Sequence, residues 1–447
     1  MKKISQTLSW VMQGKSGVAA TIQTFFFQIV IQLTNFMIGP IIARSLGPVG
    51  RGELGRILLW PQLFGAVFAL GLGPALLYNL KKSADHNEES ELYSAALTLG
   101  LIFGTFAAAL GFFLIPLFMQ KYSTQTVWIA RLFVLTAPID LFTLLILNAY
   151  KARNLFRIVN QTNYAAPVMT LGVVGALTFG QALNPLTAGL ARRGPLTGIF
   201  LWKFWELWRY YRPKFTHLKA RMKQLAPYSL RSAPINIFSQ LSDRIDQFMV
   251  IFFLNDASLG LYIVSLNLSR LIIIIQNSIL SVLFSKVASR PVKEVTEMAG
   301  RAARVGLLLS VSTAIFMATC AIPILTLYGG EKFLAAVPIF RILSLEIVLK
   351  GATLVLAQTF MAVGRPGIVS VLQGLGLGLS FPLMWILIPR YGLVGVGIAL
   401  LCSTSIRLIT ILGCYPLILK ISPPSLIPTL QDLVYLKNAI ANRRAKP

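Results

Sequence analysis

Charged side chains interrupt long apolar stretches in the second half of this 447-residue chain. Five are cations and three are carboxylates: Arg244, Arg270, Arg341, Lys350 and Arg407, with Asp243, Asp246 and Glu346. An ionised group inside an apolar helix is costly unless it is paired or hydrated, so these groups are expected to face a protein interior. The surplus of two cations suits an anionic cargo such as a phosphate or diphosphate, whose oxygens a guanidinium binds in a bidentate way.

The spacing of these residues leaves a structural and a functional interpretation open. Glu346 and Lys350 are four residues apart and can pair on one helix face. In a different apolar stretch, Asp243 and Asp246 are three residues apart and share one helix face, whereas Arg244 points about 100° away from Asp243. In the structural interpretation, buried ion pairs fix the packing of the helices. In the functional interpretation, the same groups line a hydrated cationic cavity near the middle of the membrane.

We predict that one central cavity holds the phosphates of the cargo through Arg244, Arg270, Lys350 and Arg407. Four carboxylates are candidates for ion coupling or for ion pairs: Asp140, Asp243, Asp246 and Glu346. No catalytic, cofactor or metal site is expected, because the three cysteines are scattered and the two histidines are isolated. The glycine-rich stretch 46–54 lacks a nucleotide-binding pattern and is better explained as a tight turn between helices.

Composition places these residues in a membrane protein. The chain is 55% apolar and 13% charged, with a mean hydropathy of +0.71. No cleavable signal pattern precedes the first apolar stretch, which is therefore expected to stay as an anchor. The net charge of +26 is carried between apolar stretches, so it indicates positive-inside sorting and not nucleic-acid binding.

Twelve apolar stretches have the length of a membrane span, which needs about 20 residues. They are 17–44, 54–79, 92–119, 127–150, 157–180, 194–210, 228–254, 257–285, 302–328, 334–362, 366–388 and 391–419. The sixth is the weakest, because Arg192 and Arg193 precede it and Lys203 and Glu206 interrupt it. The expected fold is an all-α polytopic membrane protein of about twelve transmembrane helices.

Basic residues assign the loops to sides and divide the chain. Most Lys and Arg fall on the side that holds both termini, which predicts that both termini are cytoplasmic. The basic segment 211–227 is predicted to connect an N-terminal six-helix lobe, 1–210, to a C-terminal lobe, 228–420. Residues 421–447 would form a cytoplasmic tail. An even number of helices in each lobe predicts a parallel repeat.

A short internal repeat supports two equivalent halves. Residues 31–35 (IQLTN) return as 239–243 (SQLSD), 208 positions later, and Gly52 meets Gly260 at the same offset. Membrane chains that repeat after half their length are typically transporters with a substrate path between the halves.

Four motifs resemble those of bacterial polysaccharide flippases, which belong to the multidrug/oligosaccharidyl-lipid/polysaccharide exporter superfamily. The stretch 43–53 (ARSLGPVGRGE) resembles the first-turn signature of that family. The second-half signature is matched by 243–246 (DRID) with 259–262 (LGLY). The stretches 149–153 (AYKAR) and 361–365 (MAVGR) resemble the ends of the fourth and tenth spans. The pair Arg192 and Arg193 departs from the family pattern.

This resemblance implies two MATE-like lobes that work by alternating access in the inner membrane. The implied cargo is an oligosaccharide linked to undecaprenyl diphosphate, held in a cationic lumen and moved to the periplasmic leaflet. Coupling to H⁺ or Na⁺ and cooperation with a glycan polymerase or glycosyltransferases are further implications. Two alternatives remain: a drug or metabolite antiporter of the same superfamily, or an integral-membrane glycan polymerase or ligase. An antiporter for cationic drugs would need acidic walls, and an enzyme would need a long outer loop.

Overall fold

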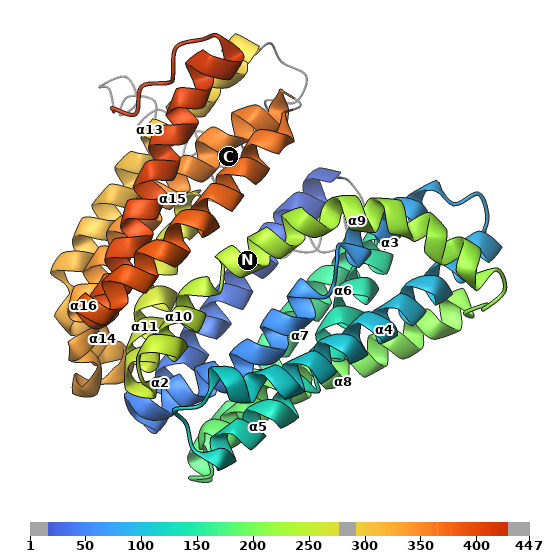
Figure 1. Ribbon diagram of the computed structural model, residues 1–447, viewed down its shortest axis with the longest axis horizontal. Coiled ribbons are helices and arrows are strands. Elements are labelled where there is room, and N and C mark those ends of the chain that lie inside the picture. Colours follow the sequence, from blue (N-terminus) through green and yellow to red (C-terminus); the bar gives the residue numbers. More distant parts are fainter. Residues whose placement is uncertain (1–16, 277–291, 364, 428–447) are drawn as a thin grey trace, which may run out of the picture. The chain divides into compact units, whose positions relative to one another are not determined.

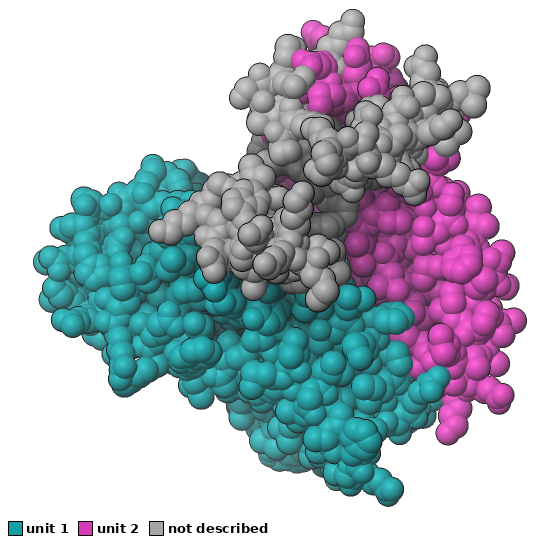
Figure 2. Space-filling view, turned by 180° about the vertical axis from the view of Figure 1, so that it is seen from behind, with its two compact units in different colours: residues 1–244 teal, residues 245–447 magenta. Residues whose placement is uncertain are grey.

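The computed structural model describes residues 17–276, 292–363 and 365–427, and within these ranges it contains helices and no strand. The chain divides into two compact units, unit 1 (Met1–Arg244) and unit 2 (Ile245–Pro447), coloured separately in Figure 2. Unit 1 holds α2 (Gly17–Val67), α3 (Leu72–Lys82), α4 (His86–Phe118), α5 (Thr124–Val134), α6 (Ala137–Ala152), α7 (Phe156–Phe179), α8 (Pro185–Tyr211) and α9 (Leu218–Ser242).

The described residues of unit 2 are 245–276, 292–363 and 365–427. Its elements are α10 (Ile245–Phe253), α11 (Asp256–Ser269), η1 (Arg270–Ile272), α13 (Val292–Thr319), α14 (Ala321–Gly329), η2 (Glu331–Ala336), α15 (Val337–Ala362), α16 (Pro366–Cys414) and η3 (Tyr415–Leu419). In its main apolar core, α13, α15 and α16 pack together around Phe360 and Tyr415.

Each of the twelve predicted ranges is mostly helical where the structure describes it, but three are interrupted: 54–79 between α2 and α3, 127–150 between α5 and α6, and 228–254 between α9 and α10. The predicted turn at 46–54 is observed as a break in α2 at Gly47, whose φ of 65° lies in the left-handed region that glycine favours. A second break, at Gly392 with φ of 56°, separates the two ranges that share α16. Residues 277–285 of the eighth range, the N-terminal residues 1–16 and most of the tail lie outside the described residues.

The sixth range is longer than predicted. Helix α8 begins at Pro185, nine residues before the predicted start at 194. Asn184 caps it in a reciprocal arrangement with Thr187, and proline suits the first helical turn. The sequence-based boundary was wrong because Arg192 and Arg193 were expected to interrupt the span. The helix instead continues through both arginines.

The helix surfaces confirm a multi-pass membrane protein. Five described helices are long and apolar enough to cross a membrane, and the bent pair Val30–Val67 and Leu72–Lys82 is a sixth candidate. Large apolar side chains on α4 are exposed, among them Phe106, Phe113 and Leu117. Lipid covers such a surface without the cost that water would impose. The count of twelve crossing helices stays a prediction.

The helix breaks follow the internal repeat. Unit 1 breaks at Gly47, and α11 of unit 2 starts after Asn255, which caps it by accepting a hydrogen bond from the Ser258 amide at 2.9 Å. These two positions are 208 residues apart, the offset found in the sequence. The division into lobes at 211–227 nevertheless stays a prediction, since compactness alone places the boundary after Arg244.

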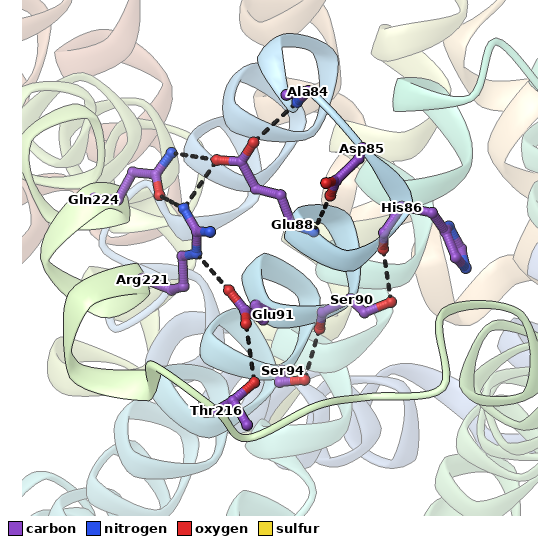
Figure 3. A network of polar contacts seen from close by, with 10 residues as sticks. All are labelled: Ala84, Asp85, His86, Glu88, Ser90, Glu91, Ser94, Thr216, Arg221 and Gln224. Carbon is purple, nitrogen blue, oxygen red and sulfur yellow. Dashed lines mark hydrogen bonds and ion pairs between the residues drawn. The ribbon is translucent and has the colours of Figure 1, made fainter.

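The connector is fastened to the start of α4 by a clasp of polar side chains, shown in Figure 3. Arg221 on α9 donates to Glu91 at 2.8 Å and to Glu88 at 2.9 Å. Gln224 donates to Glu88 at 3.2 Å, and Thr216 donates to Glu91 at 2.9 Å. Both carboxylates precede the apolar run that starts at Leu92, so they lie outside the span. The clasp holds the start of α9 against α4, and α9 also packs on α3 within unit 1.

The clasp predicts a stability that depends on pH. The amide of Ala84 is the main cause that lowers the pKa of Glu88 from its ordinary value of 4.5, and Arg221 is the main cause for Glu91. Depressed carboxyl pKa values stabilise the fold above pH 4.5, and the stabilisation is lost as pH falls through the folded-state values. We expect the thermal unfolding temperature to fall on acidification below that pH, and to fall less in Arg221→Gln.

Lys219→Gln is the matched control for this measurement, because Lys219 is exposed on the same helix and makes no ion pair in the described part of the chain. It should keep the pH dependence of the unmodified protein. An Arg221→Gln variant with an unchanged pH profile would show that the clasp does not contribute to stability.

Candidate functional site

A cavity of about 420 Å³ lies in unit 1, among α2, α3, α6 and α9. Its charged lining residues are Asp140 and Lys151 on α6 and Arg244 after the end of α9. Four amide side chains also line it: Gln62, Asn148, Asn236 and Gln240. The remaining lining is small or apolar, including Ala66, Leu141 and Leu144. The cavity therefore combines charge, hydrogen-bonding groups and an apolar wall.

The close approach of α9 to the start of α3 shapes one edge of this cavity. Gly71 has a φ of 73°, and a Cβ built there would lie 2.2 Å from the Ser232 hydroxyl and 2.7 Å from the Ser229 carbonyl. Ser229 donates to the carbonyl of Leu70 at 2.6 Å, across the same contact. Only glycine satisfies both the backbone angle and the spacing, so this position fixes where Asn236 and Gln240 enter the cavity.

Asp140 is paired with an arginine that sequence reasoning had treated as an anomaly. The Arg193 Nη1 atom lies 2.5 Å from Asp140 Oδ1. The Arg193 side chain is 8% exposed and that of Asp140 is 21% exposed, so the pair is largely shielded from solvent. Asp140 Oδ2 is buried without a hydrogen-bond partner among the described residues. Arg193 on α8, which departs from the family pattern, thus has a carboxylate partner in Asp140 on α6.

Three charged residues line the cavity. Asp140 pairs with Arg193, and the other two, Lys151 and Arg244, are cations. Sequence reasoning missed Lys151 as a site residue, although it lies in the 149–153 motif. It also missed the four amides, which carry no charge and occur too often in helices to stand out. Helical periodicity in the fourth span could have identified part of this set, because Lys151 lies one turn after Asn148 and therefore on the same helix face.

A second group of predicted residues gathers in unit 2. Asp246 on α10 is 4% exposed and accepts a short hydrogen bond from the Tyr262 hydroxyl on α11. Arg270 and Lys350 are close enough to act on Asp246 electrostatically. The carboxylate also accepts from the Gln247 amide at 2.8 Å. These four groups come from α10, α11, η1 and α15; Asp246 and Tyr262 are buried, and Arg270 and Lys350 are half-buried.

Two arrangements expected from helical spacing are not observed: the pair of Glu346 with Lys350, and the shared helix face of Asp243 and Asp246. Glu346 accepts a hydrogen bond from Thr404 at 2.7 Å, and within the described residues it forms no ion pair with Lys350. The Thr404 hydroxyl on α16 competes for the carboxylate that the helical spacing offered to Lys350. Asp243 and Asp246 also do not share a face, because α9 ends at Ser242 and α10 begins at Ile245. The interruption leaves Asp243 exposed and Asp246 buried.

Arg407 lies across a glycine on the neighbouring half of α16. A Cβ built at Gly376 would lie 2.8 to 3.0 Å from the Arg407 side chain, so any larger residue there would push the guanidinium aside. Arg407 Nη2 donates to the side-chain amide oxygen Oε1 of Gln373 at 3.5 Å. Both partners are half-buried.

The predicted cargo-binding residues thus fall into two sets. Arg244 belongs to the cavity of unit 1, and Arg270, Lys350 and Arg407 belong to unit 2. Arg341, the remaining cation, is exposed and donates to the Ala318 carbonyl at 3.0 Å. A single cavity shared by Arg244, Arg270, Lys350 and Arg407 stays a prediction.

Solved structures with this fold cover nearly the whole chain. A lipid II flippase MurJ, in an inward closed conformation, matches with a TM-score of 0.73 and 16% identity, over 94% of this chain and 89% of that chain. An inward-facing multidrug resistance MATE family transporter of the MOP superfamily matches with a TM-score of 0.68 and 13% identity, over 86% and 96%. A MOP superfamily transporter from Pyrococcus furiosus matches with a TM-score of 0.61 and 13% identity, over 90% and 95%.

These matches confirm the predicted MATE-like, all-α membrane fold. Comparison with curated protein sequences found no match. A family model described as Polysaccharide biosynthesis protein matches residues 41–338, which is about two-thirds of the chain. The matched range includes the motifs at 43–53, 149–153 and 243–246 on which the resemblance rests. The chain belongs to this polysaccharide biosynthesis protein family.

Proposed function

We propose that this protein flips an oligosaccharide linked to undecaprenyl diphosphate from the cytoplasmic to the periplasmic leaflet of a bacterial inner membrane. The observation that carries the proposal is the cavity of unit 1, where Lys151 and Arg244 face a space of about 420 Å³. A diphosphate leaving water needs cations to replace its hydration, and a guanidinium offers paired donors to its oxygens. Family membership supports a cargo used in polysaccharide biosynthesis.

The other walls of the cavity fit the remaining parts of such a cargo. Gln62, Asn148, Asn236 and Gln240 offer both donors and acceptors, as sugar hydroxyls require. The cavity also contains apolar side chains that tolerate the start of a polyprenyl chain. A cationic drug would meet the wrong charge here, which disfavours the antiporter alternative.

We assign ion coupling to the cluster of unit 2. Asp246 is the most buried of the predicted carboxylates, and it has a hydroxyl partner and two cations nearby. Binding of H⁺ or Na⁺ at a buried carboxylate changes its charge, and this can bias an alternating-access equilibrium. In this proposal both termini are cytoplasmic, and glycosyltransferases or a glycan polymerase act before or after transport.

Deleting the gene for this protein tests the proposal in cells. We expect surface polysaccharide to fall, and the lipid-linked oligosaccharide to accumulate on the cytoplasmic leaflet, because synthesis continues while transport stops. A plasmid copy should reverse both effects. Normal surface polysaccharide together with a changed susceptibility to cationic drugs would instead support the antiporter alternative.

A further inference from the structure

The C-terminal end of α8 carries an exposed aromatic face. Trp202, Trp205 and Trp208 are spaced three residues apart and are 65%, 54% and 36% exposed. This spacing keeps neighbouring rings on the same side of the helix. Tryptophan favours the boundary between the acyl chains and the headgroups, because its ring is apolar and its N–H is polar. The face therefore places the end of α8 at a membrane–water interface.

A basic hollow lies directly beyond this face. It has a volume of about 510 Å³ and is lined by Trp208, Arg209, Arg212 and Pro213. Arg212 ends the helix in the left-handed conformation, with a φ of 45°, and its amide donates to the Trp208 carbonyl at 2.9 Å. The Arg209 guanidinium lies 5.0 Å from the centre of the Trp205 ring. The backbone of Arg212 is thus held at the end of the helix, and the Arg209 guanidinium lies against an aromatic ring.

The arginines of this hollow have no carboxylate partner among the described residues. Neither Arg209 nor Arg212 makes an ion pair there, whereas Arg221, further along the chain, pairs with Glu88 and Glu91. Arg153 adds further positive charge nearby, since its guanidinium lies 3.4 Å from the centre of the Tyr210 ring. Two exposed guanidiniums beside an interfacial tryptophan are complementary to a phosphate at the depth of lipid headgroups.

We propose that Trp208, Arg209 and Arg212 bind the headgroup phosphate of an anionic phospholipid. The acyl chains of this lipid lie along the Trp202 and Trp205 face of α8. This site is separate from the cargo cavity, because none of its residues lines that cavity. The site anchors the connector to the membrane surface at the point where it leaves α8.

The test measures phosphatidylglycerol binding to the purified full-length protein by native mass spectrometry, with phosphatidylcholine as the neutral comparison. We expect the double variant Arg209→Gln/Arg212→Gln to bind phosphatidylglycerol roughly tenfold more weakly, because two cations near the headgroup are lost. Trp205→Leu should weaken binding by a smaller factor, because it removes the ring that positions Arg209 but leaves both charges.

The matched control is Lys219→Gln/Lys223→Gln, which removes the same charge from two exposed positions further along the connector. It should bind phosphatidylglycerol as the unmodified protein does. Unfolding temperatures measured in phosphatidylcholine should agree among all variants. The proposal is overturned if the arginine variant binds normally, if the lysine variant loses as much affinity, or if millimolar inorganic phosphate displaces the lipid. The last outcome would identify a site for free phosphate.

Discussion

Replacing Arg244 with alanine is expected to reduce export of the lipid-linked glycan by at least about tenfold. A hydrogen bond to a charged group contributes about 1.5–3 kcal/mol, and tenfold in an equilibrium corresponds to about 1.4 kcal/mol. Arg244 lines the cavity of unit 1 with Lys151, where the phosphates of the proposed cargo would bind. The readout is surface polysaccharide in a deletion strain that carries the variant on a plasmid. Arg244→Lys should rescue only part of the loss, because the ammonium cannot bind two oxygens in parallel.

Arg231→Ala is the matched control for this result. Arg231 lies on α9 as an exposed residue that does not line the cavity, so its loss removes the same charge without touching the site. Both variants should accumulate in the membrane at the level of the unmodified protein. Normal export by Arg244→Ala at normal expression would show that Arg244 is a packing residue.

Replacing Asp140 with leucine is expected to destabilise unit 1 by about 3–5 kcal/mol, because it strands the Arg193 guanidinium in a largely buried position. The double variant Asp140→Leu/Arg193→Met should recover most of that loss, since it removes both charges together. The measurement is thermal unfolding of the purified variants in detergent.

The double variant also separates the two interpretations of this pair. If Asp140 and Arg193 serve packing alone, export should return with stability. If the carboxylate takes part in transport, the double variant should be stable and inactive. A single variant that unfolds at the temperature of the unmodified protein would contradict the buried ion pair itself.

Much of the fold could be predicted from the sequence, because apolar length and glycine position are local signals. The break at Gly47 falls in the predicted turn at 46–54, whereas the break at Gly392 falls at the second residue of the last predicted range, 391–419. The start of α8 could not be predicted in the same way, since Arg193 reads as an interruption until its partner on α6 is known. A charged side chain in an apolar helix is costly unless it has a partner, and that partner can lie far away in the sequence.

The candidate site was harder to predict for the same reason. The residue types around the second-half cluster were identified, but the choice of partner was not. Helical spacing predicted that Glu346 could pair with Lys350, whereas in the structure Glu346 accepts a hydrogen bond from Thr404 on α16. Spacing also put Asp243 and Asp246 on one face, and the interruption between α9 and α10 separates them. In the first half, Lys151 and the amides become a site only when α2, α6 and α9 come together.

Binding of a short polyprenyl diphosphate to the purified protein tests the central claim most directly. Isothermal titration with farnesyl diphosphate, farnesyl phosphate and farnesol separates the contribution of each phosphate from that of the chain. The proposed cavity predicts that affinity rises with each phosphate, and that Lys151→Ala/Arg244→Ala removes most of this difference while farnesol binding stays unchanged. Equal affinities for the three ligands, or a double variant that still prefers the diphosphate as the unmodified protein does, would contradict a diphosphate site in the cavity of unit 1.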